Sequence, residues 1–266
     1  MTTHPDTGFA ELHTISNYSF LRGASHPEEL VKKAHELGYR AIALTDECTY
    51  AGLVKAHMAA KEHQIKLIVG AEFNIAIDET VAKVVLLAVD RATYGQISGL
   101  VTKLRRRANK GEYAAFLDDF RWGLKGCLAL WVPANDEITS LVETGRKLKE
   151  VFADMWVALE LFRDGHDLDK TAHALTLSSR LNLPIVAAND AHTHQPGRQP
   201  LQDLLTAIRH KTTVNELGHK AFSNAERSLR PISELASLYP KEIMAESLKI
   251  ADRCHFSMDE LRYEYP

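Results

Sequence analysis

Five residues that can bind metal ions stand at or just after the ends of short apolar stretches in the sequence. They are His13, Asp46, Glu72, Asp190 and His192. Imidazole nitrogens and carboxylate oxygens suit Zn, Mn or Fe as ligands, and such ions can turn bound water into a nucleophile that attacks a phosphoester. The residue types therefore indicate a metal-dependent phosphoesterase site, or the remains of one.

Each of the five residues also has a structural explanation. An aspartate at a strand end, such as Asp46, often caps the following helix, and a single buried histidine is usually a core residue with satisfied hydrogen bonds. Asp190 and His192 form the more specific signal, because side chains two residues apart in an extended segment point in the same direction. Five such residues in one place favour a site over coincidence.

Seven short apolar segments alternate with segments of helical periodicity, and these elements would position the five side chains. The predicted strands are 9–15, 41–44, 67–73, 83–89, 127–132, 155–162 and 185–188. Their alternation with helices predicts an α/β fold, a distorted parallel seven-stranded TIM-like barrel over about 9–195 with a helical extension over about 196–266. An open doubly wound sheet is the alternative. In a barrel, the carboxyl ends of the strands meet at one rim, which would collect the five residues.

Composition places the chain among ordinary globular proteins. It has 266 residues, 45% hydrophobic and 25% charged, with a formal net charge of −3, so a broad basic surface for nucleic acid is not expected. The three cysteines, Cys48, Cys127 and Cys254, are widely spaced, which fits free thiols in a reducing cytoplasm. The sequence shows neither a signal-peptide core nor an apolar run of membrane length. We therefore expect a cytoplasmic protein without membrane contact.

One basic run, KLRRRANK, ends a predicted helix. Its cations include Arg105, Arg106, Arg107 and Lys110. The favoured interpretation is a solvated helix C-terminus, where the helix dipole stabilises positive charge. The alternative is contact with nucleic acid or with an acidic partner.

Several segments are similar to those of one protein family. They read ELHTISNYSFLRGASHPEEL, ALTDEC, GAEF, LRRRANKGEY, ANDAHTHQPGRQPLQDLLTAIR and SMDELRYEYP. Through them the whole chain, 1–266, resembles the PHP (polymerase and histidinol phosphatase) domain that opens the α subunits of bacterial C-family DNA polymerases, most closely the error-prone branch. The resemblance implies the barrel-like PHP fold and a longer parent DNA polymerase, whose palm, thumb and fingers would follow this domain.

The resemblance implies roles for the five candidate residues in the family's metal site. His13 matches the first residue of its His-x-His motif, Asp46 the first of its Asp-His pair, and Glu72 its single glutamate. Asp190 and His192 match its closing Asp-x-His motif.

Four other positions depart from the family's pattern. Ile15 and Glu47 stand where the first two motifs have their second histidine, and Lys83 stands where a histidine opens the fourth strand. A histidine after the sixth strand falls near Asp164, with His166 two residues away. Ile15 cannot bind metal, Glu47 could bind through an oxygen, and an inward-pointing Lys83 would neutralise carboxylates without an ion.

These departures argue against a full trinuclear cluster. They leave either no metal, with salt bridges stabilising the site, or a single divalent ion such as Zn or Mn. Because the chain resembles the family but departs from its ligand pattern, the site without metal is the favoured alternative.

Two functions follow as expectations. The first is a structural and partner-docking domain, inactive by itself, of an error-prone, translesion-type DNA polymerase III α-like subunit. Its partners would be the polymerase core of the same chain, DNA through the parent polymerase, and other replication or mutagenesis proteins. The second is a metal-dependent phosphoesterase, acting as a 3′–5′ proofreading exonuclease, a pyrophosphatase or a histidinol-phosphatase-like enzyme.

Overall fold

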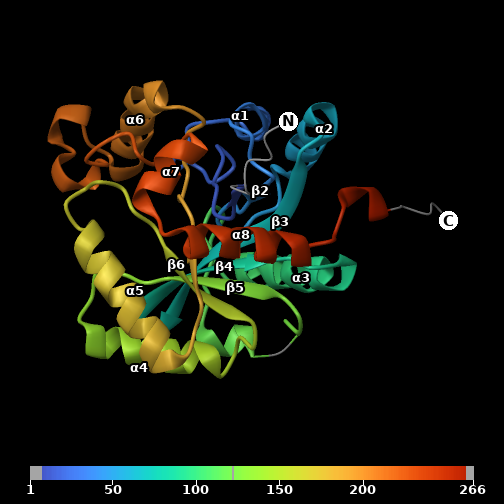
Figure 1. Cartoon of the computed structure of the whole chain (residues 1–266), viewed down its shortest axis with the longest axis vertical. Helices are drawn as coiled ribbons and strands as arrows, with labels where there is room; N and C mark the ends of the chain where they lie inside the picture. Colours follow the sequence, from blue (N-terminus) through green and yellow to red (C-terminus); the bar gives the residue numbers. More distant parts are fainter. Residues whose placement is uncertain (1–7, 122, 262–266) are drawn as a thin grey trace.

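A computed structural model of the chain describes residues 8–121 and 123–261. Its strands, all in one sheet, follow each other in the order β1 to β7 (Figure 1). The strands are β1 (Ala10–Glu11), β2 (Ala41–Leu44), β3 (Lys66–Ile77), β4 (Thr80–Leu87), β5 (Leu128–Val132), β6 (Met155–Leu159) and β7 (Ile185–Ala187). This sequential order lacks the reversal that defines a doubly wound sheet, so the alternative architecture is excluded.

Helices alternate with most of these strands and continue beyond the last one. They are α1 (Pro27–Glu36), α2 (Leu53–His63), α3 (Arg91–Arg106), α4 (Ile138–Lys149), α5 (Asp167–Leu181), α6 (Gln199–His210), α7 (Ile232–Leu238) and α8 (Lys241–Arg253). Short 3-10 helices are η1 (Leu117–Phe120), η2 (Pro196–Arg198), η3 (Val214–Glu216), η4 (Gly218–Lys220) and η5 (Met258–Glu260). The expected α/β fold with C-terminal helices is confirmed. No described helix is both long enough and apolar enough to cross a bilayer.

The sheet curls until its first and last strands meet at one end. Beyond β1 and β7, Thr14 pairs with Ala191 in a parallel bridge, and the Ile15 N–H donates to the Ala191 carbonyl at 3.0 Å. Towards the other end, α8 packs against both strands, and its Ser247 hydroxyl accepts a hydrogen bond from the Ala10 N–H at 3.2 Å. Backbone pairing thus joins the two ends of the sheet at the carboxyl rim, and α8, which crosses in front of the strands in Figure 1, packs against β1 and β7.

The prediction that all seven strands are parallel is wrong for β4. This strand runs antiparallel to both β3 and β5, because only Asp78 and Glu79 separate it from β3. A two-residue connection can join only antiparallel strands, whereas a parallel pair needs a long crossover. The reversal places the start of β4 at the same rim as the end of β3, with Lys83 opposite Asn74 in the register.

The apolar core has two layers. Between the sheet and the helices lie residues such as Ile42, Leu44 and Phe73. Inside the barrel, Ile68 and Val186 belong to a layer of strand side chains that packs against α8. The following residues in and beside the strands are all buried: Leu12, Ile42, Leu44, Ile68, Val85, Leu87 and Val186.

Candidate functional site

Three buried side chains converge at the carboxyl rim of the barrel. His13 follows β1, Glu72 lies in β3 and Asp190 follows β7, and one possible donor atom of each lies within 4.8 Å of the others. His13 Nε2 lies 2.9 Å from Glu72 Oε2 and 3.5 Å from Asp190 Oδ1. The structure thus brings together three of the five candidate ligands. In the described part of the chain, no other group of three acidic, histidine or cysteine side chains has this spacing.

A fourth residue, a glutamate that the sequence analysis missed, joins this group. Glu160 directly follows β6, and its Oε1 lies 2.7 Å from His13 Nδ1. Asp164 and His166, expected near this place, lie elsewhere: Asp164 pairs with a lysine of α5 at 2.9 Å, and His166 is exposed at the start of that helix. The signal for Glu160 was a single carboxylate inside the apolar run MWVALELF.

The surrounding carboxylates hold a proton on His13. Burial opposes the charged imidazolium, but the charges of Asp190 and Glu160 and hydrogen bonds with Glu160 and Glu72 outweigh it and raise the pKa of His13 to about 10. At neutral pH this side chain is therefore a cation whose ring nitrogens face carboxylates.

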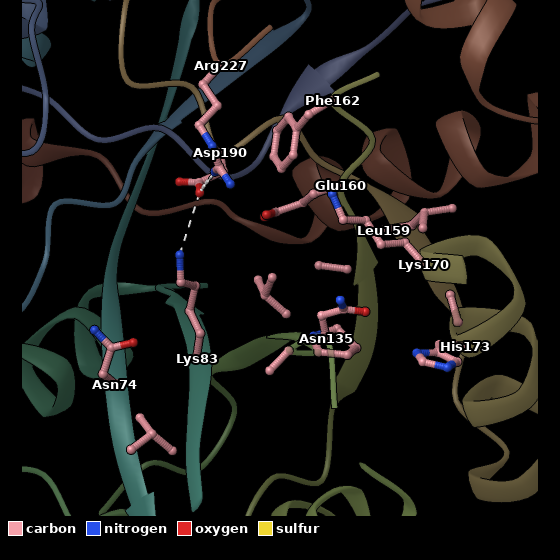
Figure 2. Close-up of a pocket in the computed structure, with 16 residues that line it drawn as sticks. Asn74, Lys83, Asn135, Leu159, Glu160, Phe162, Lys170, His173, Asp190 and Arg227 are labelled. Atoms are coloured by element: carbon pink, nitrogen blue, oxygen red, sulfur yellow. Dashed lines mark hydrogen bonds and ion pairs between the residues drawn. The ribbon is translucent and has the colours of Figure 1, made fainter. Parts of the chain in front are cut away.

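Lys83 supplies a second cation to the same carboxylates. Its Nζ lies 3.4 Å from Glu72 Oε2 and 3.5 Å from Asp190 Oδ2, and Figure 2 shows the side chain reaching from β4 toward Asp190. Burial favours the neutral form of both acids, but nearby cations outweigh it. Lys83 and Arg22 hold the pKa of Glu72 well below its usual range, and Lys83 and His13 do the same for the pKa of Asp190. Both groups are therefore ionised and paired.

Two arginines that the sequence analysis did not select complete the set of cations. Arg22 Nη1 lies 2.6 Å from Glu47 Oε2 and 2.5 Å from Glu72 Oε1. Arg227, from the C-terminal extension, pairs with Asp190, and its guanidinium lies over the ring of Phe162 at 3.9 Å. Arg22 lies in the same quoted segment as His13, but its spacing from His13 does not reveal the contact, because the turn after β1 must fold back to bring Arg22 to the rim. Arg227 comes from a distant part of the chain.

The site is balanced in charge by its own side chains. The carboxylates Glu47, Glu72, Glu160 and Asp190 face the cations His13, Arg22, Lys83 and Arg227. His13, Glu72 and Asp190 are the right donor types for one Zn or Mn ion, but Lys83 lies against two of them. A single ion bound to these three donors would therefore lie close to the Lys83 ammonium.

The two remaining candidate ligands have other contacts. Asp46 accepts hydrogen bonds from the backbone and hydroxyl groups of Ser16 and Ser19, at 2.7 to 3.1 Å, and so holds the turn after β1. His192 Nε2 lies 3.1 Å from Asp190 Oδ1, and its Nδ1 lies 3.1 Å from the Arg22 carbonyl. The structure places His192 beside the group of three and Asp46 outside it.

The basic run makes contacts within the molecule. Arg105 donates to the backbone carbonyls of Glu47 and Cys48 at 2.8 and 3.0 Å, and Arg107 forms a bidentate pair with a carboxylate of η1 at 2.6 and 2.7 Å. Arg106 and Lys110 are exposed. Arg105 thus fixes the loop that carries Glu47, a role that helix periodicity did not indicate.

A cavity of about 330 Å³ opens beside the site. Lys83, Glu160, Asp190 and Arg227 line one part of it, and residues of β3, β4, β5, β6, α5 and the loop after β5 line the rest. Figure 2 shows the charged groups at one end and Asn135 and His173 at the other. A small molecule could reach the charged groups through this cavity.

Comparison with known proteins identifies a family and a set of relatives. Residues 11–163 match the model of the PHP domain. The whole chain is 50% identical to part of an error-prone DNA polymerase of Methylococcus capsulatus. Over 97% of the chain it is 48% identical to part of an error-prone DNA polymerase of Dechloromonas aromatica. The chain spans 25% of the length of each of these relatives.

Two solved structures share the fold. A candidate metal-dependent phosphoesterase from Bifidobacterium adolescentis superposes with a TM-score of 0.54 and 16% identity over 71% of this chain and 89% of its own. An amidohydrolase from Chromobacterium violaceum, with bound sulfate and no metal, superposes with a TM-score of 0.57 and 16% identity over 70% of this chain and 88% of its own. These likenesses support the distorted TIM-like architecture expected from the sequence.

Proposed function

Because the chain belongs to the PHP domain family and is similar over its whole length to error-prone DNA polymerases, we propose that it is a structural and partner-docking domain of such a polymerase. In this proposal the domain does not hydrolyse phosphoesters, and the side-chain cations of its site replace metal ions. The polymerase core, DNA bound by the parent polymerase and other replication or mutagenesis proteins are its proposed partners, in the cytoplasm.

The observation that carries the proposal is the position of Lys83. Its ammonium lies 3.4 and 3.5 Å from carboxylate oxygens of Glu72 and Asp190, which are two of the three donors that a metal ion would need. An ammonium and a divalent cation repel each other at this distance. A bound ion would therefore have to displace Lys83 first.

In this proposal the site also lacks the residues to hold a second metal ion for phosphoester hydrolysis. A pair of ions about 3.5–4 Å apart activates the attacking water and stabilises the leaving oxygen. Ile15 is buried and apolar where the motif would supply a ligand, and Asp46 is engaged by Ser16 and Ser19. The residues present stabilise one another instead of assembling two ion sites.

The second candidate function is a single-ion phosphoesterase. The convergence of His13, Glu72 and Asp190 within 4.8 Å favours it. One Zn or Mn ion held by three protein donors would keep an open position for water and supply Lewis-acid chemistry. The adjacent cavity would admit the substrate.

Metal analysis and a nuclease assay decide between the two functions. We expect the purified chain to contain less than about one equivalent of Zn or Mn, and to release no nucleotide from a 3′-labelled primer with either metal added. The variants Asp190→Asn and Asp164→Asn serve as a matched pair, because only the first lies in the site. Activity that Asp190→Asn abolishes and Asp164→Asn retains would establish the phosphoesterase instead.

A further inference from the structure

Three large apolar side chains of helix α6 face solvent, although Leu205 and Ala207 of the same helix are half-buried and buried. Leu201, Leu204 and Ile208 are 36%, 48% and 52% exposed. Their spacing of three and four residues puts them in one stripe along the helix. Gln202 and Thr206, on the opposite side, are 2% and 5% exposed. A surface helix normally buries its apolar stripe and exposes its polar residues.

Nothing in the described part of the chain covers this stripe. The helix packs mainly against the short helices η2 and η3, and Val214 of η3 adds a further apolar side chain that is 46% exposed. Figure 1 shows α6 at the edge of the molecule, away from the strands and from α8. An apolar stripe left open in this way is typical of a protein-binding surface.

Positive charge gathers at the C-terminal end of the same helix. Arg209, Lys211 and Lys220 are exposed, and none of them forms an ion pair within the described residues. Arg209 Nη2 lies 3.3 Å from His210 Nε2, and burial together with the charges of Arg209 and Lys220 lowers the pKa of His210. Glu216 is an exposed acid in this region, and it already accepts hydrogen bonds from two threonines.

We propose that this surface of α6, with Val214, binds an acidic amphipathic helix of a partner protein. The apolar side chains of the partner would cover Leu204 and Ile208, and its carboxylates would meet Lys211. The inference rests on the proposed docking function and names the chemistry of one partner. Helix-in-groove recognition uses this combination of an apolar stripe and flanking charge.

The composition of the surface favours a protein over a nucleic acid. The segment 199–217 contains no Phe, Tyr or Trp, so it offers no ring on which unpaired bases could stack. A surface for nucleic-acid phosphates also has no need of an exposed stripe of Leu and Ile. The cations would instead give a peptide partner orientation and a fast association rate.

Fluorescence anisotropy with a labelled synthetic helix tests the proposal. The probe has about 18 residues, since shorter helices are marginal in water, with leucines at i, i+3 and i+7 and glutamates elsewhere. We expect it to bind the chain, with an affinity that falls as salt rises. A second probe with lysines in place of the glutamates should bind at least about tenfold more weakly.

Variants locate the binding surface. The double variant Leu204→Ser, Ile208→Ser and the variant Lys211→Glu should each weaken binding by about tenfold or more. The matched control is Leu168→Ser, Leu175→Ser, which removes exposed leucines of α5 and should leave binding unchanged. Circular dichroism confirms that each variant is folded, as expected for exposed positions.

Several outcomes would overturn the proposal. They are equal binding of both probes, no binding of the acidic probe, or no effect of the α6 variants. A dimer in sedimentation velocity that Ile208→Ser dissociates would identify a second copy as the occupant. Binding of a single-stranded oligonucleotide that depends on Lys211 and not on Ile208 would identify nucleic acid. None of these results bears on the metal content or nuclease activity, so failure of this inference is distinct from failure of the proposed function.

Discussion

At the scale of single residues, the site is defined by how its charges are paired. Buried ion pairs cost desolvation energy, and removing one partner leaves an uncompensated charge. Glu72 and Asp190 are almost fully buried, and both depend on Lys83 for part of their neutralisation. Of the site residues, Lys83 should therefore be one whose replacement lowers the stability of the fold.

Replacing Lys83 should destabilise the fold. We expect Lys83→Met, which keeps the aliphatic stem and removes the charge, to cost about 2–3 kcal/mol, somewhat less than a fully buried pair. Lys83 is 26% exposed, so water screens part of the loss. For a domain of this size the melting temperature should fall by about 4–10 °C.

Lys170→Met is the control for Lys83→Met. Lys170 pairs with the partly exposed Asp164, and such a pair contributes only about 0–1 kcal/mol. Equal melting temperatures for the two variants would show that Lys83 does not hold the site together.

The Lys83→Met variant should gain affinity for a metal ion. With the ammonium removed, His13, Glu72 and Asp190 can approach a single cation. Zn or Mn should then raise the melting temperature of Lys83→Met and leave the wild-type protein unchanged, because an ion that binds only the folded state stabilises it. Differential scanning fluorimetry with and without a chelator measures this. The double variant Lys83→Met, Asp190→Asn should lose the response.

At the scale of elements, the turn after β1 and the reversed strand β4 position the charged groups. Asp46 holds the turn through Ser16 and Ser19, and the turn carries Arg22 to Glu72. Gly23 closes it, since a Cβ at that position would lie 2.1 Å from the Ser16 carbonyl oxygen. Strand β4 pairs with β3 and brings Lys83 to Glu72.

Asp46→Ala should loosen this turn. It leaves two backbone N–H groups and two hydroxyls without their acceptor, and we expect a loss of about 2–4 kcal/mol from such a buried network. Hydrogen exchange should rise in residues 16–23 more than in α5. A uniform rise over the whole chain would contradict a local role for Asp46.

At the scale of the whole molecule, the buried titratable groups set how stability depends on pH. The pKa of His13 is raised to about 10, so its stabilising contribution is complete below the unfolded value of about 6.5 and is lost as pH rises towards 10. Burial raises the pKa of Glu11 to about 7, so this acid also favours the folded state at lower pH. Glu72 and Asp190 have lowered pKa values, and their contribution is lost as pH falls below about 4.

The melting temperature should therefore fall steadily from about pH 7 towards about pH 9.5. Thermal unfolding followed by circular dichroism across this range measures the effect. A constant melting temperature between about pH 6.5 and 9.5 would show that His13 is not held as a cation. Lys83→Met should flatten the acid side of the profile, because it removes the charge that depresses the two carboxyl pKa values.

The sequence alone determined the class of the fold and the core of the site. The apolar periodicities of seven segments were enough to predict the strands, while the observed strand order decided between a barrel and a doubly wound sheet. Strand-end positions selected five candidate residues, of which the structure brings His13, Glu72 and Asp190 together. These features depend on local patterns, because a strand's alternation and its end can be read from neighbouring residues.

Only the tertiary structure decided the direction of β4 and the identity of most charge partners. The two-residue turn at Asp78 and Glu79 fell between two predicted strands with no strong turn residue such as Gly or Pro, so the hairpin was missed. Arg22, Glu160 and Arg227 reach the site from separate segments. Their partners are set by chain folding over long sequence distances, which no local spacing encodes.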